Sequence, residues 1–572
     1  MKIKNILTLL CCASVVTGCV DDAYDLDNIN TDSELKIDNL VLPINIDKIL
    51  LGDVIDLNED GVLKEESGDY VISVDGEFTA PDIEIVSIRA KAPSIAPSVQ
   101  TIKGASLPST VEYDVKFDLD SAPSDFEYEM DGVDESIVSI DDISLDNFTF
   151  TLTFSIAVEN LVIKDAVLSD LSIKMPTGME ITCDYGEYDP DEGILTIDYL
   201  ETENNKATIT FTATKINLKG NEAADFNYNE HKFIFKSSLD VESGTISAYV
   251  ANTSTTEAPT LTLTKSYVLT DMVVSAFSGE IQYSIDDINI NPIELNDLPD
   301  FLNQEGTNII MSNPQIYLST NNPLAEYNLS AQAGLSLTAY RNGQEGKTVS
   351  LNDGTFTIGS NQGNTDYSFV MAPTNPSTYP AGFNNPQFVQ FTQLSNILEG
   401  NSIPTEIRVD LISPQIPTQY VKDLKLGSNL GGIQGKYMFY APLSLANGSK
   451  IIYSEREDGW STEDLEDLTI TQLEVSTSVT STIPAGVVLT GYPIDIDGNE
   501  IKDIQITGAT VNAMAKGQKV VIRTTGTIRR LDGIVFQAVI SPDGSGALAP
   551  SEYLELDDIK VKVSGSYNYK DL

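Results

Sequence analysis

Apolar and polar residues alternate over long stretches of this chain. Clear examples, all rich in Thr, Val, Ile and Phe, are residues 148–156, 208–214, 260–264 and 559–563. A period of two places successive side chains on opposite faces of a strand, so these stretches predict half-buried antiparallel strands. Short Asp/Asn-Gly turn sequences, such as Asp497-Gly498, separate the stretches. The pattern predicts an all-β protein built from tandem antiparallel β-sandwich-like domains.

Helical periodicity is scarce. The best candidate covers residues 387–399, between a proline and a glycine, with Phe391, Leu394 and Leu398 on one face. Shorter helices are expected within 47–55, 297–303 and 462–468.

Two parts of the chain resemble each other. Residues 206–220 align without gaps on 519–533, and residues 267–283 align on 553–569, where Gly279 matches Gly565. Because the matches keep their order and spacing, we expect a duplicated β-module. The alternative is convergence, since Thr-Val alternation is common to all strands.

The N-terminus has the features of an export signal. Lys2 and Lys4 precede an uncharged, largely apolar run over residues 6–16, which is well short of the ~20 residues that cross a bilayer. The run ends in Val16-Thr17-Gly18-Cys19, which resembles the bacterial lipobox. The resemblance implies that Cys19 is acylated and anchors the chain in outer-membrane lipid. Several acyl chains on one residue are sufficient for stable anchoring.

Acidic residues follow Cys19 at once. Asp21, Asp22, Asp25 and Asp27 resemble the export signal that sends Bacteroidota lipoproteins to the outer face of the outer membrane. The alternative is a solvated acidic tether without address information.

Further resemblance extends through most of the mature chain. Residues 297–302, 313–324, 441–451 and 489–499 are similar to an uncharacterised family of acidic Bacteroidota lipoproteins. This resemblance implies a location on the cell surface and no particular activity.

These observations predict the domain organisation. The expected parts are a signal peptide (1–18), an acidic tether (19–34), an N-terminal β region (35–145), a first β-sandwich module (146–290), a central β-rich unit with short helices (291–464) and a second module (465–572).

Charge narrows the set of partners. Of 572 residues, 85 are Asp or Glu and 34 are Lys or Arg, a formal net charge of −51. Such a chain repels phosphate backbones, so a nucleic-acid partner is not expected. Hydrophobic residues make up 41% of the sequence, which predicts a folded protein. With Cys11 and Cys12 removed and Cys19 acylated, Cys183 has no partner for a disulfide.

Few groups could support catalysis. His231 is the single histidine, and a Ser-His-Asp triad or a Cys183/His231 pair is less plausible than structural roles for both residues. Too few His and Cys residues remain for zinc, haem or iron–sulfur sites, so no metal or cofactor is expected. Residues 495–500 favour a hairpin turn over a calcium loop. Carboxylate-only glycoside hydrolysis stays open.

Two weaker candidates concern glycans. Trp460, the single tryptophan, is either a sugar-stacking platform or, more plausibly, a lid over a core edge. Asp120-Ser121-Ala122 resembles the O-glycosylation sequon of exported Bacteroidota proteins, which makes Ser121 a candidate acceptor.

The leading interpretation is a non-enzymatic, surface-exposed outer-membrane lipoprotein that acts in adhesion, assembly or ligand capture, with a glycan or a surface protein as partner. One alternative is a glycan-binding accessory protein of a polysaccharide-utilisation system. The second is a carboxylate-dependent glycoside hydrolase. The sequence leaves the oligomeric state open.

Overall fold

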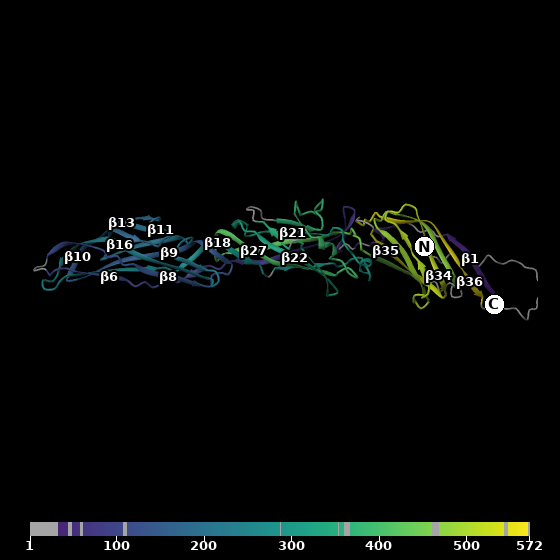
Figure 1. The fold of residues 1–572 in the computed structure, drawn as a ribbon, viewed down its shortest axis with the longest axis horizontal. Coiled ribbons are helices and arrows are strands. Elements are labelled where there is room, and N and C mark those ends of the chain that lie inside the picture. Colours follow the sequence, from purple (N-terminus) through teal and green to yellow (C-terminus); the bar gives the residue numbers. More distant parts are fainter. Residues whose placement is uncertain are drawn as a thin grey trace, which may run out of the picture.

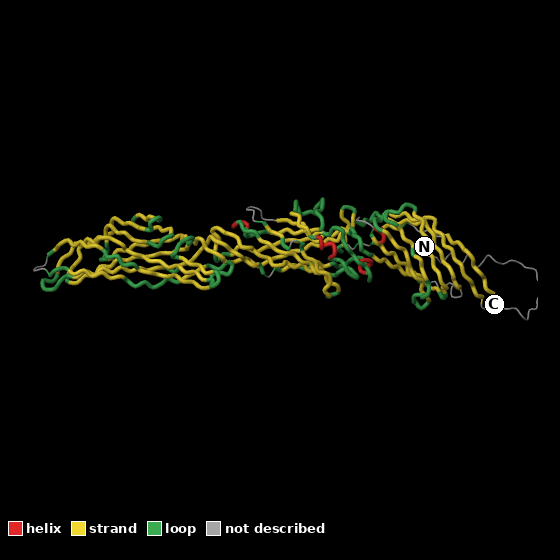
Figure 2. Tube along the Cα trace, viewed as in Figure 1, coloured by secondary structure: helices red, strands yellow, loops and turns green. Residues whose placement is uncertain are grey.

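Three β-sandwiches lie in a row and form a rod. The computed structural model describes residues 33–43, 48–55, 57, 61–106, 111–286, 288–352, 354–359, 367–459, 468–542 and 547–569. Figure 1 shows the rod, and Figure 2 shows that almost all regular structure in it is strand. The predicted fold class, all-β with antiparallel sandwiches and few short helices, is confirmed.

The distal sandwich, residues 85–286, forms the end of the rod farthest from β1 and β36 (Figure 1). Its strands are β5 (Ile88–Ala90), β6 (Ser98–Lys103), β7 (Glu112–Asp118), β8 (Ser124–Asp131), β9 (Ile137–Glu159), β10 (Leu161–Lys174), β11 (Met179–Cys183), β12 (Glu187–Asp189), β13 (Ile194–Glu201), β14 (Lys206–Asn217), β15 (Ala224–Asn227), β16 (Lys232–Asn252), β17 (Thr260–Leu269) and β18 (Met272–Ser284).

The middle sandwich combines residues 61–84 with residues 288–450. Its elements are β3 (Leu63–Glu66), β4 (Asp69–Glu84), β19 (Asn289–Ile290), β20 (Ile293–Glu294), α2 (Asp300–Asn303), β21 (Gln315–Thr320), η4 (Ala325–Tyr327), β22 (Ala331–Arg341), β23 (Gln344–Ser350), β24 (Phe356–Ile358), β25 (Tyr367–Ala372), β26 (Gln387–Gln390), η5 (Thr392–Asn396), β27 (Glu406–Lys425) and β28 (Asn429–Pro442).

The basal sandwich combines residues 33–55 with residues 451–569. Its elements are β1 (Ser33–Pro43), β2 (Ile49–Leu50), α1 (Leu51–Val54), β29 (Ile451–Glu457), β30 (Leu468–Ser481), β31 (Gly486–Asp495), β32 (Gln505–Thr507), β33 (Ala509–Val511), β34 (Gln518–Ile528), β35 (Leu531–Ser541) and β36 (Tyr553–Tyr569).

The expected helix over residues 387–399 is wrong. Its first residues form β26, which pairs in parallel with β25, and only the short 3-10 helix η5 follows. Phe391, Leu394 and Leu398 are buried as expected, but the segment gains more from completing a sheet than from a single isolated helix. The two other expected helices within the described residues shrink to the four-residue α1 and α2. Residues 462–467 lie outside the described residues.

The chain runs outward along the rod and then returns. β1 pairs with β36 in the basal sandwich, β4 pairs with β28 in the middle one, and β5 pairs with β18 in the distal one. The basal and middle sandwiches therefore each combine an early and a late segment of the chain, whereas the distal sandwich is one continuous segment. Strands from residues 35–145 are spread over all three sandwiches.

The same strand pairing recurs along the rod. In the distal sandwich β9 pairs with β14 and β18, while β10 pairs with β13 and β16. In the basal sandwich β30 pairs with β34 and β36, while β31 pairs with β33 and β35. The strands that share sequence, β14 with β34 and β18 with β36, occupy equivalent positions.

The middle sandwich follows the same scheme, which the sequence comparison did not detect. There β21 pairs with β25 and β28, while β22 pairs with β24 and β27. Three sandwiches of one topology thus follow one another along the rod.

A glycine marks the last strand of each sandwich. A Cβ atom on Gly279 in β18 would overlap the carbonyl oxygen of Ser139, and one on Gly565 in β36 would overlap that of Thr469. A Cβ atom on Gly435 in β28 would overlap first the ring of Phe78 and then the carbonyl oxygen of Ser319. The absent side chain lets the last strand approach the first strand of its sandwich closely.

The distal and middle sandwiches are joined more tightly than the middle and basal ones. β18 pairs with β27, so one twelve-stranded sheet runs through the distal and middle sandwiches. One hydrophobic core also fills both, with phenylalanines such as Phe148, Phe150 and Phe211 fully buried. This core reaches into the basal sandwich through Ile451 and Leu548, and the rest of the basal sandwich has a smaller core of valine and alanine. None of the helices in the described part of the chain is long and apolar enough to cross a membrane.

A buried carboxyl lies where the basal and middle sandwiches meet. The segment before β36 contacts the middle sandwich through the Tyr70 amide, which donates to the Leu548 carbonyl at 2.9 Å. Glu552, in the same segment, has a buried Oε2 without a hydrogen-bond partner among the described residues. Burial first, and the nearby Asp69 carboxylate to a smaller extent, raise the pKa of Glu552 from 4.5 to about 7. The ionised form is thus disfavoured at this junction.

Substituting the matched glycine should destabilise the distal sandwich. Gly279→Ala forces a methyl group against the Ser139 carbonyl, so we expect the free energy of unfolding to fall by about 1–3 kcal/mol. Urea unfolding measures the loss. Ser284→Ala, on an exposed position of the same strand, should change it by less than about 0.5 kcal/mol. Equal effects of the two substitutions would contradict a close approach at Gly279.

The stability of the chain should depend on pH through Glu552. The pKa of Glu552 is higher in the folded chain than in the unfolded chain. Protonated Glu552 therefore contributes its full stabilisation below pH 4.5, and this contribution is lost as the pH rises through about 7. Glu552→Gln should therefore match the wild type at pH 4 and exceed it at pH 8 by about 1–2 kcal/mol, a value reduced for partial solvent exposure. Urea unfolding at both values tests this. Parallel pH profiles would mean that Glu552 ionises freely in the folded chain.

Candidate functional site

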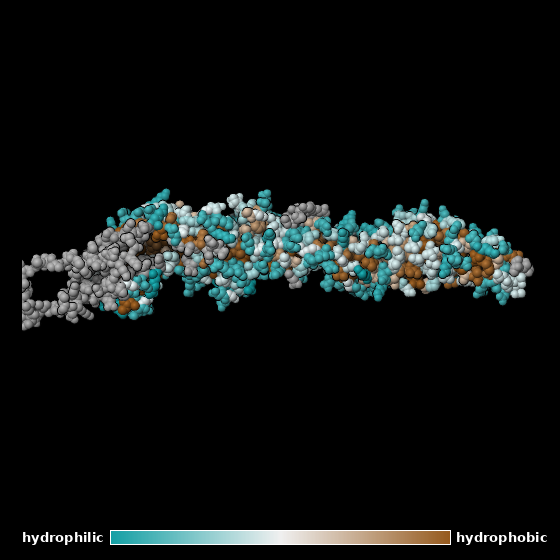
Figure 3. Space-filling model, turned by 180° about the vertical axis from the view of Figure 1, so that it is seen from behind, coloured by the Kyte–Doolittle hydropathy of each residue, from teal (hydrophilic) through white to brown (hydrophobic). Residues whose placement is uncertain are grey.

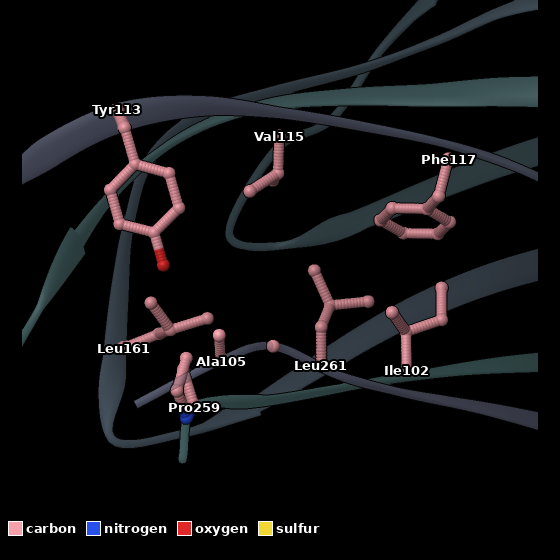
Figure 4. A pocket seen from close by; sticks show the side chains of 9 residues that line it. Ile102, Ala105, Tyr113, Val115, Phe117, Leu161, Pro259 and Leu261 are labelled. Carbon is pink, nitrogen blue, oxygen red and sulfur yellow. The ribbon is translucent and has the colours of Figure 1, made fainter. Parts of the chain in front are cut away.

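An apolar pocket of about 270 Å³ opens at the distal end of the rod. It lies between β6 and β7, the edge strands of the two distal sheets, and is lined by Ile102, Gly104, Ala105, Tyr113, Val115, Phe117, Leu161, Pro259 and Leu261. Figure 4 shows the side chains of β7 facing those of the opposite layer across the pocket. In Figure 3, which shows the rod from behind, apolar residues gather at the surface near the same end.

The pocket exists because the sandwich is incompletely closed along these edges. Among the described strands β6 pairs only with β17, and β7 pairs only with β16. Tyr113, Val115 and Phe117 alternate along β7 and point inward, yet all three remain half-buried. Inward residues of the central strand β9, such as Phe150 and Phe154, are completely buried. The edge strands thus present apolar side chains that no other strand covers.

Polar contacts close the pocket toward the middle of the rod. The Gln100 side chain donates to the Asp118 carbonyl and accepts from the Asp120 amide, both at 3.1 Å, and so ties β6 to the end of β7. Lys265, only 1% exposed, donates from Nζ to the Asp120 carbonyl at 2.7 Å. Burial lowers the pKa of this ammonium group. The pocket therefore ends at a fixed polar wall.

The lining itself holds almost no polar group. Among the described residues of the lining, the Tyr113 hydroxyl is the only side-chain oxygen or nitrogen, and Figure 4 shows it directed across the pocket toward Leu161 and Pro259. None of the described lining residues carries a carboxylate or an amine. A ligand here must be held mainly by burial of apolar surface.

Charged residues lie on the outer faces of the strands around the pocket. Tyr249 donates to Glu112 Oε2 at 2.6 Å, and Lys164 Nζ lies 3.5 Å from Glu112 Oε1. These contacts, the Tyr249 hydrogen bond first, lower the pKa of Glu112. Glu112, Asp114 and Asp118 alternate with the inward apolar residues of β7. Lys116 lies on the same outer face, so both carboxylate and ammonium groups surround the pocket.

A second hollow, of about 20 Å³, lies in the core of the middle sandwich among residues such as Phe78 and Leu318. A volume of this size holds roughly one water molecule. It offers no room for a ligand.

Ser121, the candidate glycosylation residue, is exposed and hydrogen-bonded. Its hydroxyl donates to Asp240 Oδ2 at 2.6 Å, and the Ala122 amide donates to Asp240 Oδ1 at 2.9 Å. The sequon therefore lies beside the polar wall of the pocket. Glycosylation of Ser121 stays a prediction.

The structure does not join Cys183 to His231. Cys183 ends the edge strand β11, while His231 lies in the turn between β15 and β16, in the other sheet. Burial raises the pKa of the Cys183 thiol, which disfavours the reactive thiolate. His231 has a positive φ of 48°, a ring 5.7 Å from that of Tyr228, and a buried Nδ1 without a partner among the described residues. The surroundings of Cys183 and His231 are therefore typical of structural side chains and not of a nucleophile–base pair.

The turn at residues 495–500 is a hairpin turn, as the sequence indicates. Asp495 Oδ1 accepts from the amides of Asp497 and Asn499, and Ile494 forms an antiparallel bridge with Glu500. The carboxylate of Asp495 thus accepts hydrogen bonds from the backbone of its own turn. In the described part of the chain, no group of three or more His, Cys, Asp or Glu side chains could hold a metal ion.

Several candidate residues lie outside the described residues. These are Cys19, Asp21, Asp22, Asp25, Asp27 and Trp460. Their roles stay predictions. The pocket residues, in turn, were not singled out by the sequence, because residues 98–103 and 112–118 alternate like any other strand. Only the pairing of strands distinguishes an open edge from a covered one.

Comparison with known proteins does not indicate a function for this chain. No protein-family model matches the chain, and no curated protein does. A crystal structure of a candidate secreted protein from Parabacteroides distasonis aligns at 16% identity with a TM-score of 0.35, over 50% of this chain and 89% of its own. A cryo-EM structure of broad bean stain virus aligns at 12% identity with a TM-score of 0.13, over 52% and 90%. Such low TM-scores carry no conclusion about function.

Thiol labelling tests the absence of a nucleophile pair. At pH 7.4 we expect Cys183 in the folded chain to react with iodoacetamide at least ~10-fold more slowly than in denaturant, because burial disfavours the thiolate. His231→Gln should leave the rate in the folded chain unchanged. A substantial loss of reactivity in His231→Gln would reveal a functional Cys–His contact. The chain used begins at residue 19 and carries Cys19→Ala, so that Cys183 is the only thiol.

Proposed function

We propose that this chain is a lipid-anchored outer-membrane protein on the cell exterior, without enzymatic activity, whose distal end captures a ligand. The three sandwiches act as a stalk and the distal pocket as the binding site. Adhesion and assembly belong to the same proposal, because a stalk that holds a binding surface away from the membrane serves each of them.

The observation that carries the proposal is the placement of the chain's ends. Ser33 pairs with Tyr569 at the basal end, whereas the pocket lies at the opposite end of the rod (Figure 1). An anchor at Cys19 therefore tethers the basal sandwich and leaves the distal sandwich farthest from the membrane. This geometry suits capture of a ligand outside the cell.

Features of the pocket favour capture over catalysis. Glycoside hydrolysis requires two carboxyl groups facing a common cleft, and the lining residues that the structure describes include none. Sugar recognition requires several hydrogen-bonding groups, and the described part of the lining offers only the Tyr113 hydroxyl. The pocket thus supports an apolar ligand better than a glycan.

Two observations test the anchor. Metabolic labelling with palmitate should mark the wild-type protein, and Cys19→Ala should abolish the label and release the protein from the membrane fraction. Cys183→Ala is the matched control and should keep the label. Protease added to intact cells should degrade the wild-type protein. Label in Cys19→Ala would refute the lipid site, and protection until the envelope is broken would refute the outward orientation.

A further inference from the structure

We propose that the distal pocket binds a free single-chain amphiphile, whose unbranched alkyl chain of about ten carbons fills the slot and whose uncharged head group stays at the mouth. This inference rests on the proposed function, since it names the class of ligand that the distal end captures.

The size of the pocket sets the length of the chain. An engineered apolar cavity of roughly 150 Å³ in another protein takes up benzene, which has six carbons. In proportion, about 270 Å³ accommodates roughly eleven carbon atoms. A two-chain membrane lipid exceeds this volume, so the ligand has one chain.

The shape of the pocket favours a chain over a compact ring system. Tyr113 and Phe117 line it from the same face of β7, four residues apart, which corresponds to about 13 Å along a strand. Across the strands the space is limited by side chains from both sheets, which lie about 10 Å apart. The pocket is therefore longer than it is wide, and Gln100 closes one of its ends.

The polarity of the pocket decides where the head group lies. The lining holds no charge, so burial of an ionised group would be costly. The Tyr113 hydroxyl, toward the distal end, is the one group that could bond a polar head. The chain carries −51 overall, so its field disfavours an anionic head. An uncharged head group fits both conditions.

A chain-length series tests the proposal. The chain from residue 19 onward with Cys19→Ala, free of acyl groups, is titrated by calorimetry with 1-O-alkylglycerols of six to fourteen carbons, below their aggregation concentrations. Each added CH₂ should raise the affinity about fourfold, because burial of a CH₂ contributes a nearly constant free energy. The increase should stop near ten to eleven carbons, where the slot is full.

Three variants separate the pocket from non-specific binding. Ala105→Trp fills the slot from an exposed lining position and should weaken binding at least ~10-fold. Val162→Trp adds the same ring beside Leu161 but on the outer face, where Val162 is 47% exposed, and should change affinity by less than about twofold. Val115→Ala should move the plateau to chains about two carbons longer, a shift that misfolding would not produce.

The outcomes are distinct. Absence of saturable binding, affinity that keeps rising beyond twelve carbons, or equal effects of Ala105→Trp and Val162→Trp would each overturn the proposal. Saturable binding of a glycan or an extended peptide without binding of alkylglycerols would do so as well. If alkyl binding fails while palmitate labelling and protease accessibility behave as expected, only the ligand class is wrong and the proposed surface role stands.

Discussion

Backbone pairing between early strands and strands that follow much later in the chain is the interaction on which this structure depends. β1 pairs along one edge of β36 in the basal sheet, and β4 and β5 pair likewise with β28 and β18. Because one chain supplies the early and the later strand of each pair, it runs outward to the distal end of the rod and then returns. The closeness of Ser33 to Tyr569, the division of the basal and middle sandwiches between two segments, and the placement of the pocket at the far end all follow from this pairing.

Local structure followed well from the sequence, because alternation is a local property. Residues 148–156 and 208–214 form parts of β9 and β14, and their apolar members are buried. Partner choice is not local, so the outward and return path could not be derived from periodicity. The prediction of a helix at 387–399 was wrong for the same reason, because residues 387–390 pair with β25, which periodicity does not indicate.

The candidate site shows the same limit. Nothing in the alternation of Glu112–Asp118 distinguishes an edge strand from a central one, and the decisive fact is that no described strand pairs with its outer edge. The repeat was easier to predict from the sequence than the pocket. Gly279 and Gly565 matched in sequence, but the third copy is visible only in the pairing of β21 with β25 and β28. What concealed it was the divergence of the surrounding strand sequence.

The pairing of β1 with β36 also determines how the rod would respond to mechanical force. β1 enters at the outer end of the basal sandwich, where Ser33 faces Tyr569, and runs inward to Pro43, which faces Lys560. A pull on Ser33 that is resisted at the distal end is directed along β1, so the hydrogen bonds between the two strands are loaded in shear and must break together. A peeling geometry would break them one at a time. The same pairing that closes the fold thus gives the rod its resistance to tension between its two ends.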